Sequence, residues 1–108
     1  MSASTFADEF KDADIAVNFL YRNIKLIEEI DFTEKLVTMM QEQRFLWPGE
    51  VEDGNVLGKR RRIRYFVQRM TYRISMRRIF PLLSLFEEHN LSIGQQLKRL
   101  LEDDLKSY

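Results

Sequence analysis

Apolar residues recur along most of the chain at steps of three and four, the spacing that places them on one face of an α-helix. Ala16, Leu20, Ile24 and Ile27 form the first stripe and predict a helix over about 14–30. The same spacing predicts a second helix over about 31–44, a fourth through the segment 59–77, a fifth from at or just before Pro81, and a sixth over about 92–105. We predict no strand.

Proline and short polar residues indicate where several helices begin. The pairs Asp31–Glu34 and Ser92–Gln95 have the spacing of a capping box, in which two side chains satisfy the free amides of a first helical turn. Pro48 suits a first helical position because it has no amide hydrogen to leave unpaired. We therefore expect one short helix over 48–53, closed by Gly54, and an all-α antiparallel bundle of six helices with a short third helix.

Length and composition set the outer limits. A chain of 108 residues with 44% hydrophobic content can build one core but not two. We expect a loosely ordered leader at 1–13 and a single domain at 14–106. The absence of cysteine excludes a disulfide framework, a thiolate metal site and a cysteine nucleophile. The same absence favours a reducing, cytoplasmic location. No apolar run reaches the roughly 20 residues of a membrane span, so we expect a soluble protein without a membrane partner.

Charge is distributed unevenly. The chain has 17 basic and 17 acidic residues, yet the window 59–78 (KRRRIRYFVQRMTYRISMRR) contains nine basic residues and no acidic one. Such segregation favours binding to a polyanion or to an acidic patch of another protein. Because the bases of 59–64 have no acidic neighbour in sequence, we predict that an opposing partner compensates them.

Candidate catalytic chemistry is sparse. The single histidine, His89, follows Glu87 and Glu88, but consecutive helical residues point in different directions, so we expect a solvent-exposed side chain near a helix end. The segment 54–60 (GNVLGKR) lacks the spacer and the hydroxyl residue of a phosphate-binding loop. We predict no enzyme, metal or cofactor. For Trp47, packing on the short helix is favoured over exposure as an interface anchor.

Two long segments resemble caspase-recruitment domains of the death-fold superfamily. Leu20–Asp53 (LYRNIKLIEEIDFTEKLVTMMQEQRFLWPGEVED) is similar to their first three helices: a helix ending in an acidic pair, a short break, an apolar helix and a short acidic one. Arg61–Leu105 is similar to helices four to six, and FPLLSLFEEHN resembles the proline-led fifth helix of apoptosome-scaffold members. Ile79 and Phe80 replace the family's arginine–glycine pair, which leaves the death-effector and pyrin subfamilies open.

This resemblance implies homotypic association, in which a basic patch on helices one and four meets an acidic patch on helices two and three of another domain. Carried onto this sequence, the basic patch consists of Arg22, Lys25, Lys59, Arg60, Arg61, Arg62 and Arg64. The acidic patch consists of Glu34, Glu42, Glu50, Glu52 and Asp53. The implied partner is a like domain of a caspase or an adaptor, or a second copy of this chain bound head to tail.

The basic window supports one alternative from another class, a small nucleic-acid-binding domain whose fourth helix lies on phosphates. The compensating negative charge elsewhere would repel a long polyanion. The overall pI near 6.6 is also far below that of most such domains. Nucleic acid is therefore the less favoured partner.

Overall fold

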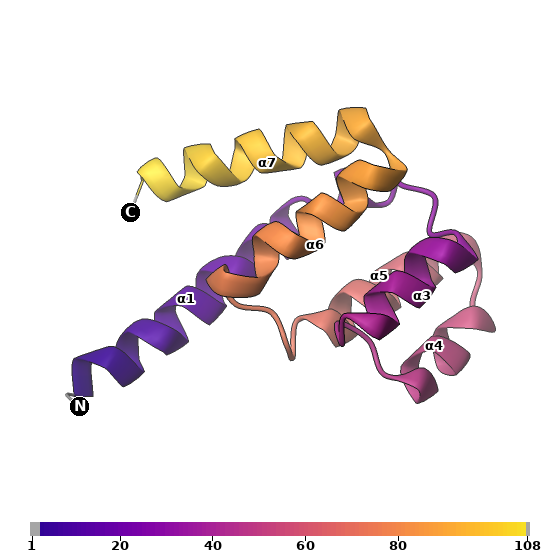
Figure 1. Ribbon diagram of the computed structural model, residues 1–108, viewed down its shortest axis with the longest axis horizontal. Coiled ribbons are helices and arrows are strands. Elements are labelled where there is room, and N and C mark those ends of the chain that lie inside the picture. Colours follow the sequence, from indigo (N-terminus) through magenta and orange to yellow (C-terminus); the bar gives the residue numbers. More distant parts are fainter. Residues whose placement is uncertain (1–2, 108) are drawn as a thin grey trace.

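The computed structural model describes the backbone of residues 3–107 and the side chains of residues 12–107. Within this part of the chain all regular structure is helical, and no strand occurs, as the spacing of apolar residues predicted. Residues 3–107 form seven helices (Figure 1): α1 (Ala3–Arg22), α2 (Ile24–Ile27), α3 (Glu34–Glu42), α4 (Pro48–Asn55), α5 (Lys59–Met70), α6 (Met76–His89) and α7 (Leu91–Lys106).

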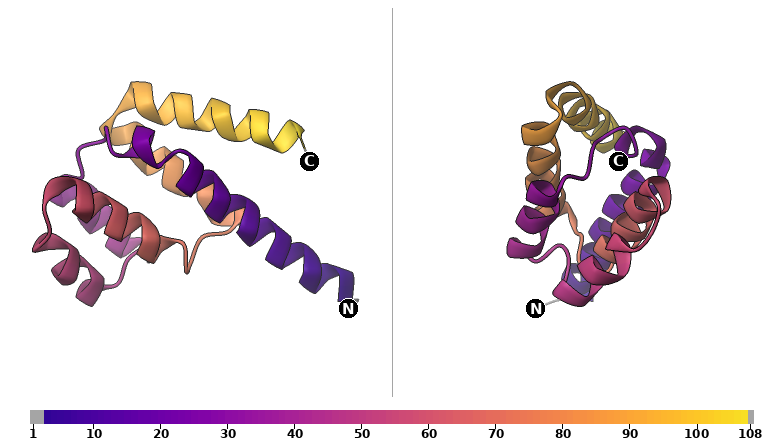
Figure 2. Two further views of the ribbon diagram at one scale, coloured as in Figure 1. Left: turned by 180° about the vertical axis from the view of Figure 1, so that it is seen from behind. Right: turned by 90° about the vertical axis from the view of Figure 1, so that its right-hand side faces the viewer.

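Helix α6 lies at the centre of the arrangement. It forms an antiparallel hairpin with α7 and also contacts α1 and α3. Helices α3, α4 and α5 make a second group, in which α4 packs on both α3 and α5. Figures 1 and 2 show this group beside the α6–α7 hairpin, with α1 running along the back of α6 and its first turns projecting beyond the other helices.

One continuous core joins the two groups. Phe32, in the link between α2 and α3, is 3% exposed and lies between aromatic rings of α5 and α6. Its ring is stacked with that of Phe66 at a centroid distance of 6.3 Å and is 5.7 Å from that of Phe86. Offset and tilted aromatic pairs of this kind stabilise a core beyond the area that they bury. Phe32 therefore ties the α3–α5 group to the hairpin.

The first helix differs from the prediction at both ends. Residues 3–13, where we expected a loosely ordered leader, are helical. The first 22 residues contain neither glycine nor proline, so nothing stops a helix formed at 14–22 from extending toward the N-terminus. At the other end, Asn23 divides the single helix predicted over 14–30 into two helices, α1 and α2. Its side-chain amide donates to the Phe19 carbonyl at 2.9 Å, a local bond that competes with regular helix.

The helix caps lie close to the predicted positions but on other residues. Thr33, not Asp31, caps α3, because its hydroxyl oxygen accepts from the Leu36 amide at 3.2 Å. Asn90, not Ser92, caps α7 and accepts from the Ile93 amide at 3.1 Å. In both cases the cap is the polar residue directly before the first helical turn, where its side chain reaches the free amides. Pro81, expected near a helix start, lies in the second turn of α6.

Two buried glycines permit close approach between helices. A Cβ atom on Gly94 of α7 would lie 2.2 Å from the Cα atom of Glu87, in the backbone of α6. A Cβ atom on Gly54 would lie 2.2 Å from a ring carbon of Phe66 on α5. We predicted that Gly54 ends the short helix. Gly54 instead lies within α4, where its lack of a side chain lets α4 pack on α5.

Candidate interaction surface

Four of the predicted basic residues meet at one depression of about 690 Å³ between α2 and the first turns of α5. We call it the basic depression. Its lining consists of Lys25, Glu28, Glu29, Lys59, Arg60 and Arg64. Four positive and two negative side chains leave a formal excess of two positive charges. The two halves of the lining are at least 30 residues apart in sequence, and the fold brings them together.

Glu28 neutralises part of this positive charge. Its carboxylate accepts from Nε of Arg64 and lies 3.7 Å from Nε of Arg60. The Glu28 side chain is 12% exposed, whereas those of Arg60 and Arg64 are 81% and 54% exposed. Exposed pairs of this kind contribute at most about 1 kcal/mol. We predicted that an opposing partner compensates the bases of 59–64, and the structure shows that Glu28 compensates two of them, Arg60 and Arg64, within the chain.

Lys25 and Lys59 are the two basic residues of the basic depression that do not pair with Glu28. Both are exposed, and neither makes an ion pair with any side chain of residues 12–107. An ammonium group on an exposed, flexible stem can reach a carboxylate on a docking surface without first breaking an internal contact. The ammonium groups of these two lysines are therefore not engaged by any carboxylate of residues 12–107.

The remaining predicted basic residues lie elsewhere. Arg62 turns toward α3 and α4, where it donates to the Phe32 carbonyl at 2.7 Å and to Asn55 Oδ1 at 3.1 Å. Arg22 pairs with Asp104 of α7. Arg61 is exposed, and in the described part of the chain it forms no ion pair. Arg62 thus makes internal hydrogen bonds and does not lie in the basic depression with the other predicted residues.

Glu50 was predicted to belong to the acidic patch, and this prediction is wrong. Its side chain is 8% exposed. It accepts from Nη1 and Nη2 of Arg73 at 2.6 and 3.0 Å and from Nε of Arg69 at 2.7 Å. It also accepts from the Trp47 amide at 2.8 Å, which caps the start of α4. A carboxylate so enclosed is unavailable to a partner.

The surroundings of Glu50 also fix its charge. Burial raises the pKa of this carboxyl group, but hydrogen bonds from Arg73, Arg69 and the Trp47 amide outweigh burial and lower the pKa from 4.5 to about 2. Glu50 is therefore ionised at all ordinary pH values. It compensates two arginines of the basic window from a distant point in the sequence.

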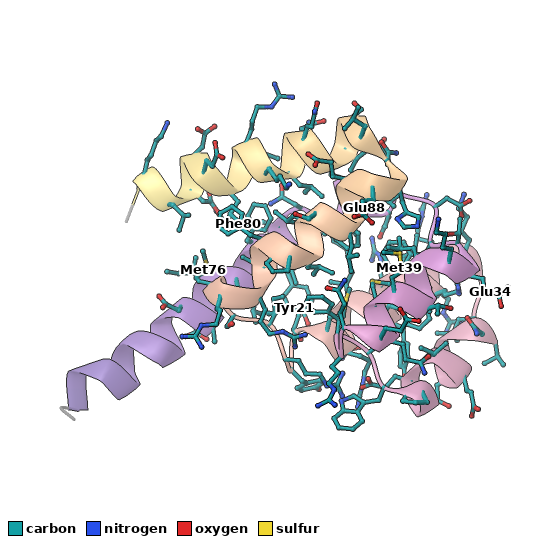
Figure 3. The ribbon with its side chains drawn as sticks, in the orientation of Figure 1. Tyr21, Glu34, Met39, Met76, Phe80 and Glu88 are labelled. Atoms are coloured by element: carbon teal, nitrogen blue, oxygen red, sulfur yellow. The ribbon has the colours of Figure 1, made fainter. Side chains whose placement is uncertain are left out.

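The other predicted acidic residues are exposed on α3 and α4: Glu34, Glu42, Glu52 and Asp53. Figure 3 shows Glu34 at the outer edge of the molecule, at the start of α3. It lines a hollow of about 360 Å³ together with Arg62 and Asn55. Asp53 accepts from the Tyr65 hydroxyl at 3.4 Å. One predicted basic residue therefore lies among the acidic ones, and the two faces are not fully separated.

Trp47 stands exposed, contrary to the predicted packing. It is 59% exposed, and the guanidinium carbon of Arg73 lies 5.1 Å from its ring centroid. A groove of about 390 Å³ adjoins it, lined by Gln41, Arg44, Leu46, Trp47 and Pro48. We call it the Trp47 groove. Because Glu50 accepts hydrogen bonds from Arg73, the guanidinium that makes the cation–π contact with the indole ring is held in position.

The backbone beside the Trp47 groove is strained at Arg44. Arg44 has a φ of 64°, in the left-handed region that favours glycine. The Phe45 amide donates to the Met40 carbonyl at 2.8 Å and the Arg44 amide to that of Gln41 at 3.0 Å. These bonds form a Schellman motif at the end of α3, in which glycine is the usual left-handed residue. The apolar spacing that predicts a helix here does not reveal this turn.

His89 does not assemble a site. Its Nδ1 atom lies 3.0 Å from the Leu85 carbonyl within α6, and the residue is half-buried rather than exposed. Among residues that the structure describes, no three histidine, cysteine or acidic side chains are grouped so as to hold a metal ion.

In the same part of the chain, every helix is too short or too polar to cross a membrane.

No protein-family model, curated protein or solved structure matches this chain.

Proposed function

We propose that this chain is a protein-interaction module of the caspase-recruitment type, whose basic depression binds an acidic surface on another domain of the same kind. The convergence of Lys25, Lys59, Arg60 and Arg64 at one depression carries this proposal. The module acts by association rather than by catalysis, and its place of action is the cytoplasm.

The order of helices supports this class. Helices α1 and α2 are separated only by Asn23, and counted as one interrupted helix they reduce the seven helices to six. The third of these six is then α4, with eight residues, and the basic α5 is the fourth. This is the order that the resemblance to caspase-recruitment domains implies.

The chemistry of the lining defines the partner. An excess of two positive charges favours carboxylates, and the exposed lysines supply contacts that no side chain of residues 12–107 satisfies. Complementary charge orients two proteins and speeds their encounter more than it raises the final affinity. Exposed charges are screened over roughly 8 to 10 Å at physiological salt, so binding should weaken as salt rises.

The decisive experiment reverses the two uncommitted lysines. The double variant Lys25→Glu/Lys59→Glu changes the basic depression and leaves the ion pairs of Glu28 in place. A matched control, Lys35→Glu/Lys106→Glu, applies the same change in charge at exposed positions outside the depression. Binding of each protein to a panel of purified caspase-recruitment domains is measured by titration calorimetry over a salt series, with a 20-base-pair DNA duplex as the competing ligand.

We expect the unmodified protein and the control to bind at least one domain of the panel at low salt, and the Lys25/Lys59 variant to lose at least tenfold in affinity with unchanged helical content. Equal binding by the two variants would remove the basic depression from the mechanism. Binding to the duplex but to no domain of the panel would favour the nucleic-acid alternative.

A further inference from the structure

The connection between α5 and α6 contains a serine with arginines on both sides. Residues 71–75 are not helical, and Ser75, the last of them, is followed directly by α6. Arg73 precedes Ser75 by two residues, and Arg77 and Arg78 follow it by two and three. The window 59–78 has no acidic residue. This pattern of charge fits a serine kinase whose substrate cleft is lined by acidic side chains.

The Ser75 hydroxyl is not used to cap its helix. Ser75 is the N-cap of α6, yet within the described residues its side chain makes no cap hydrogen bond. The polar residues that cap α3 and α7 each make one. Ser75 is half-buried and lines a surface hollow of about 310 Å³ with Asp12, Met76 and Arg77. Figure 3 shows Met76 where the start of α6 lies beside α1. The hydroxyl therefore borders an open hollow and is not required for the start of α6.

Thr71 has the same sequence pattern but a different setting. Arg69 and Arg73 flank it at a distance of two residues on either side. Its hydroxyl donates to the Gln68 carbonyl at 2.5 Å, in the capping turn of α5. Phosphorylation of Thr71 would break this bond, whereas Ser75 has no cap bond to lose. The structure therefore favours Ser75 over a second candidate with arginines at the same spacing.

The flanking arginines differ in what they already bind. Arg77 is exposed and forms no ion pair with any described side chain. Arg73 donates to Glu50 through both terminal nitrogens. Ile74, the residue before Ser75, is 4% exposed. A kinase cleft that binds this segment in an extended form therefore requires a local opening, in which Ile74 leaves the core and the bonds between Arg73 and Glu50 break.

We propose that Ser75 is a phosphorylation site for an arginine-directed serine kinase, which binds it when the connection 71–75 opens. The kinase transfers the γ-phosphoryl group of magnesium-bound ATP to Oγ of Ser75. The terminal P–O bond of ATP breaks, a P–O bond to the serine forms, ADP leaves, and the hydroxyl proton passes to the catalytic carboxylate of the kinase. The phosphate carries a charge of about −2 at pH 7 and pairs with Arg77 at the same hollow.

The phosphorylation site is separate from the basic depression, whose lining does not include Ser75 or its flanking arginines. The result is therefore independent of the proposed function. The full chain is incubated with magnesium, ATP and the catalytic domain of protein kinase C, an arginine-directed serine kinase. The phosphate is then located by peptide mass mapping. We expect it on Ser75, and Thr71→Val should leave this modification unchanged. Phosphate on Thr71 and not on Ser75, or on neither residue, would overturn the proposal.

The role of the exposed arginine is tested by the rate of phosphorylation. Arg77→Gln should lower kcat/KM for Ser75 at least threefold, because the kinase loses the one flanking arginine that is exposed before the connection opens. Arg61→Gln is the matched control, since Arg61 is also exposed and forms no ion pair in the described part of the chain. It should leave kcat/KM unchanged. Equal rates for the two variants would overturn recognition through Arg77.

The opening step is tested at Glu50, which lies outside the segment that the kinase binds. Glu50→Gln should raise the rate at which Ser75 is phosphorylated several-fold, because Arg73 is held less firmly. The control Glu52→Gln should not change the rate, and equal rates would overturn the opening step. Circular dichroism checks that each variant is folded. If Glu50→Gln is unfolded, amide hydrogen exchange of the unmodified protein replaces it. The amides of 72–76 should then exchange faster than those within α5 and α6, and equal protection would count against the opening step in the same way.

Discussion

Glu50 on α4 and Arg73, three residues after the end of α5, are joined by two hydrogen bonds between charged groups. The same carboxylate accepts from Arg69, and Arg73 also donates to the Phe45 carbonyl at 3.2 Å. This network links the start of α4 to the end of α5. It also positions Arg73 against the Trp47 ring. Two arginines of the basic window 59–78 are therefore paired within the protein.

Replacing Glu50 by glutamine should destabilise the protein by on the order of 3 kcal/mol, because Arg69 and Arg73 lose the carboxylate that they share in a partly buried site. Urea denaturation at pH 7 measures this loss. Glu52→Gln, an exposed neighbour on the same helix, is the control and should change the free energy of unfolding by less than about 0.5 kcal/mol. Equal effects of the two substitutions would contradict a structural role for Glu50.

The pH dependence of stability provides an independent check. The pKa of Glu50 is about 2 in the folded protein and 4.5 for an ordinary glutamate. Its ionised form therefore stabilises the fold fully above about pH 4.5, and this contribution is lost as the pH falls toward 2. Thermal melts between pH 2 and pH 6 should show this loss in the unmodified protein and a smaller one in Glu50→Gln. Parallel pH profiles would contradict the assignment.

Gly94→Ala should destabilise the α6–α7 hairpin by several kcal/mol, because its Cβ atom would meet the Glu87 backbone at 2.2 Å and backbone cannot rotate aside. Chemical denaturation and amide hydrogen exchange of α7 measure the effect. Gly49→Ala is the matched control, since a Cβ atom there has no neighbour within 4 Å. Because alanine favours helix over glycine, this control should be neutral or stabilising by about 1 kcal/mol.

Arg44→Gly should stabilise the fold by about 0.5 to 1 kcal/mol. Glycine adopts the left-handed conformation of this position without the steric cost that a side chain brings, and its greater freedom in the unfolded chain offsets only part of the gain. Denaturant titration measures the change. A loss of stability greater than about 1 kcal/mol would show that the Arg44 side chain makes a stabilising contact.

The cap of α7 gives a prediction in which sequence and structure differ. Asn90→Ala should cost about 1 kcal/mol, because the Ile93 amide loses its acceptor. Ser92→Ala should cost less than about 0.5 kcal/mol, since Ser92 is exposed within the first turn of α7. The reverse ranking in a denaturant titration would restore the predicted capping box Ser92–Gln95.

The apolar spacing was sufficient to predict that residues 3–107 form helices and no strand, and to locate most of the helices approximately, because burial of one stripe is a property of the local sequence. The ends of the helices were harder to predict from the sequence. Asn23 interrupts the first helix through a bond to the Phe19 carbonyl, and Thr33 caps α3 where Asp31 had better spacing. Such choices depend on which side chain reaches a free backbone group after the turn has formed.

The candidate site was predictable only in part. Lys25, Lys59, Arg60 and Arg64 do converge, but the compensation of the basic window was not visible in the sequence. Glu28 and Arg64 are 36 residues apart, and Glu50 and Arg73 are 23 apart, so pairs of this kind are known only once the helices are packed. The exposure of Trp47 likewise depends on how α4 meets α5.

Asn90 is both the C-cap of α6 and the N-cap of α7, so it is the single residue between the two helices. Each residue of a helix rotates it by about 100°. One amino acid inserted beside Asn90 would therefore turn the inward side of α7, with Gly94, Leu97 and Leu101, toward solvent. Length changes at this corner should be far less tolerated than at Val56–Gly58, and a loop-insertion series would rank the two connections.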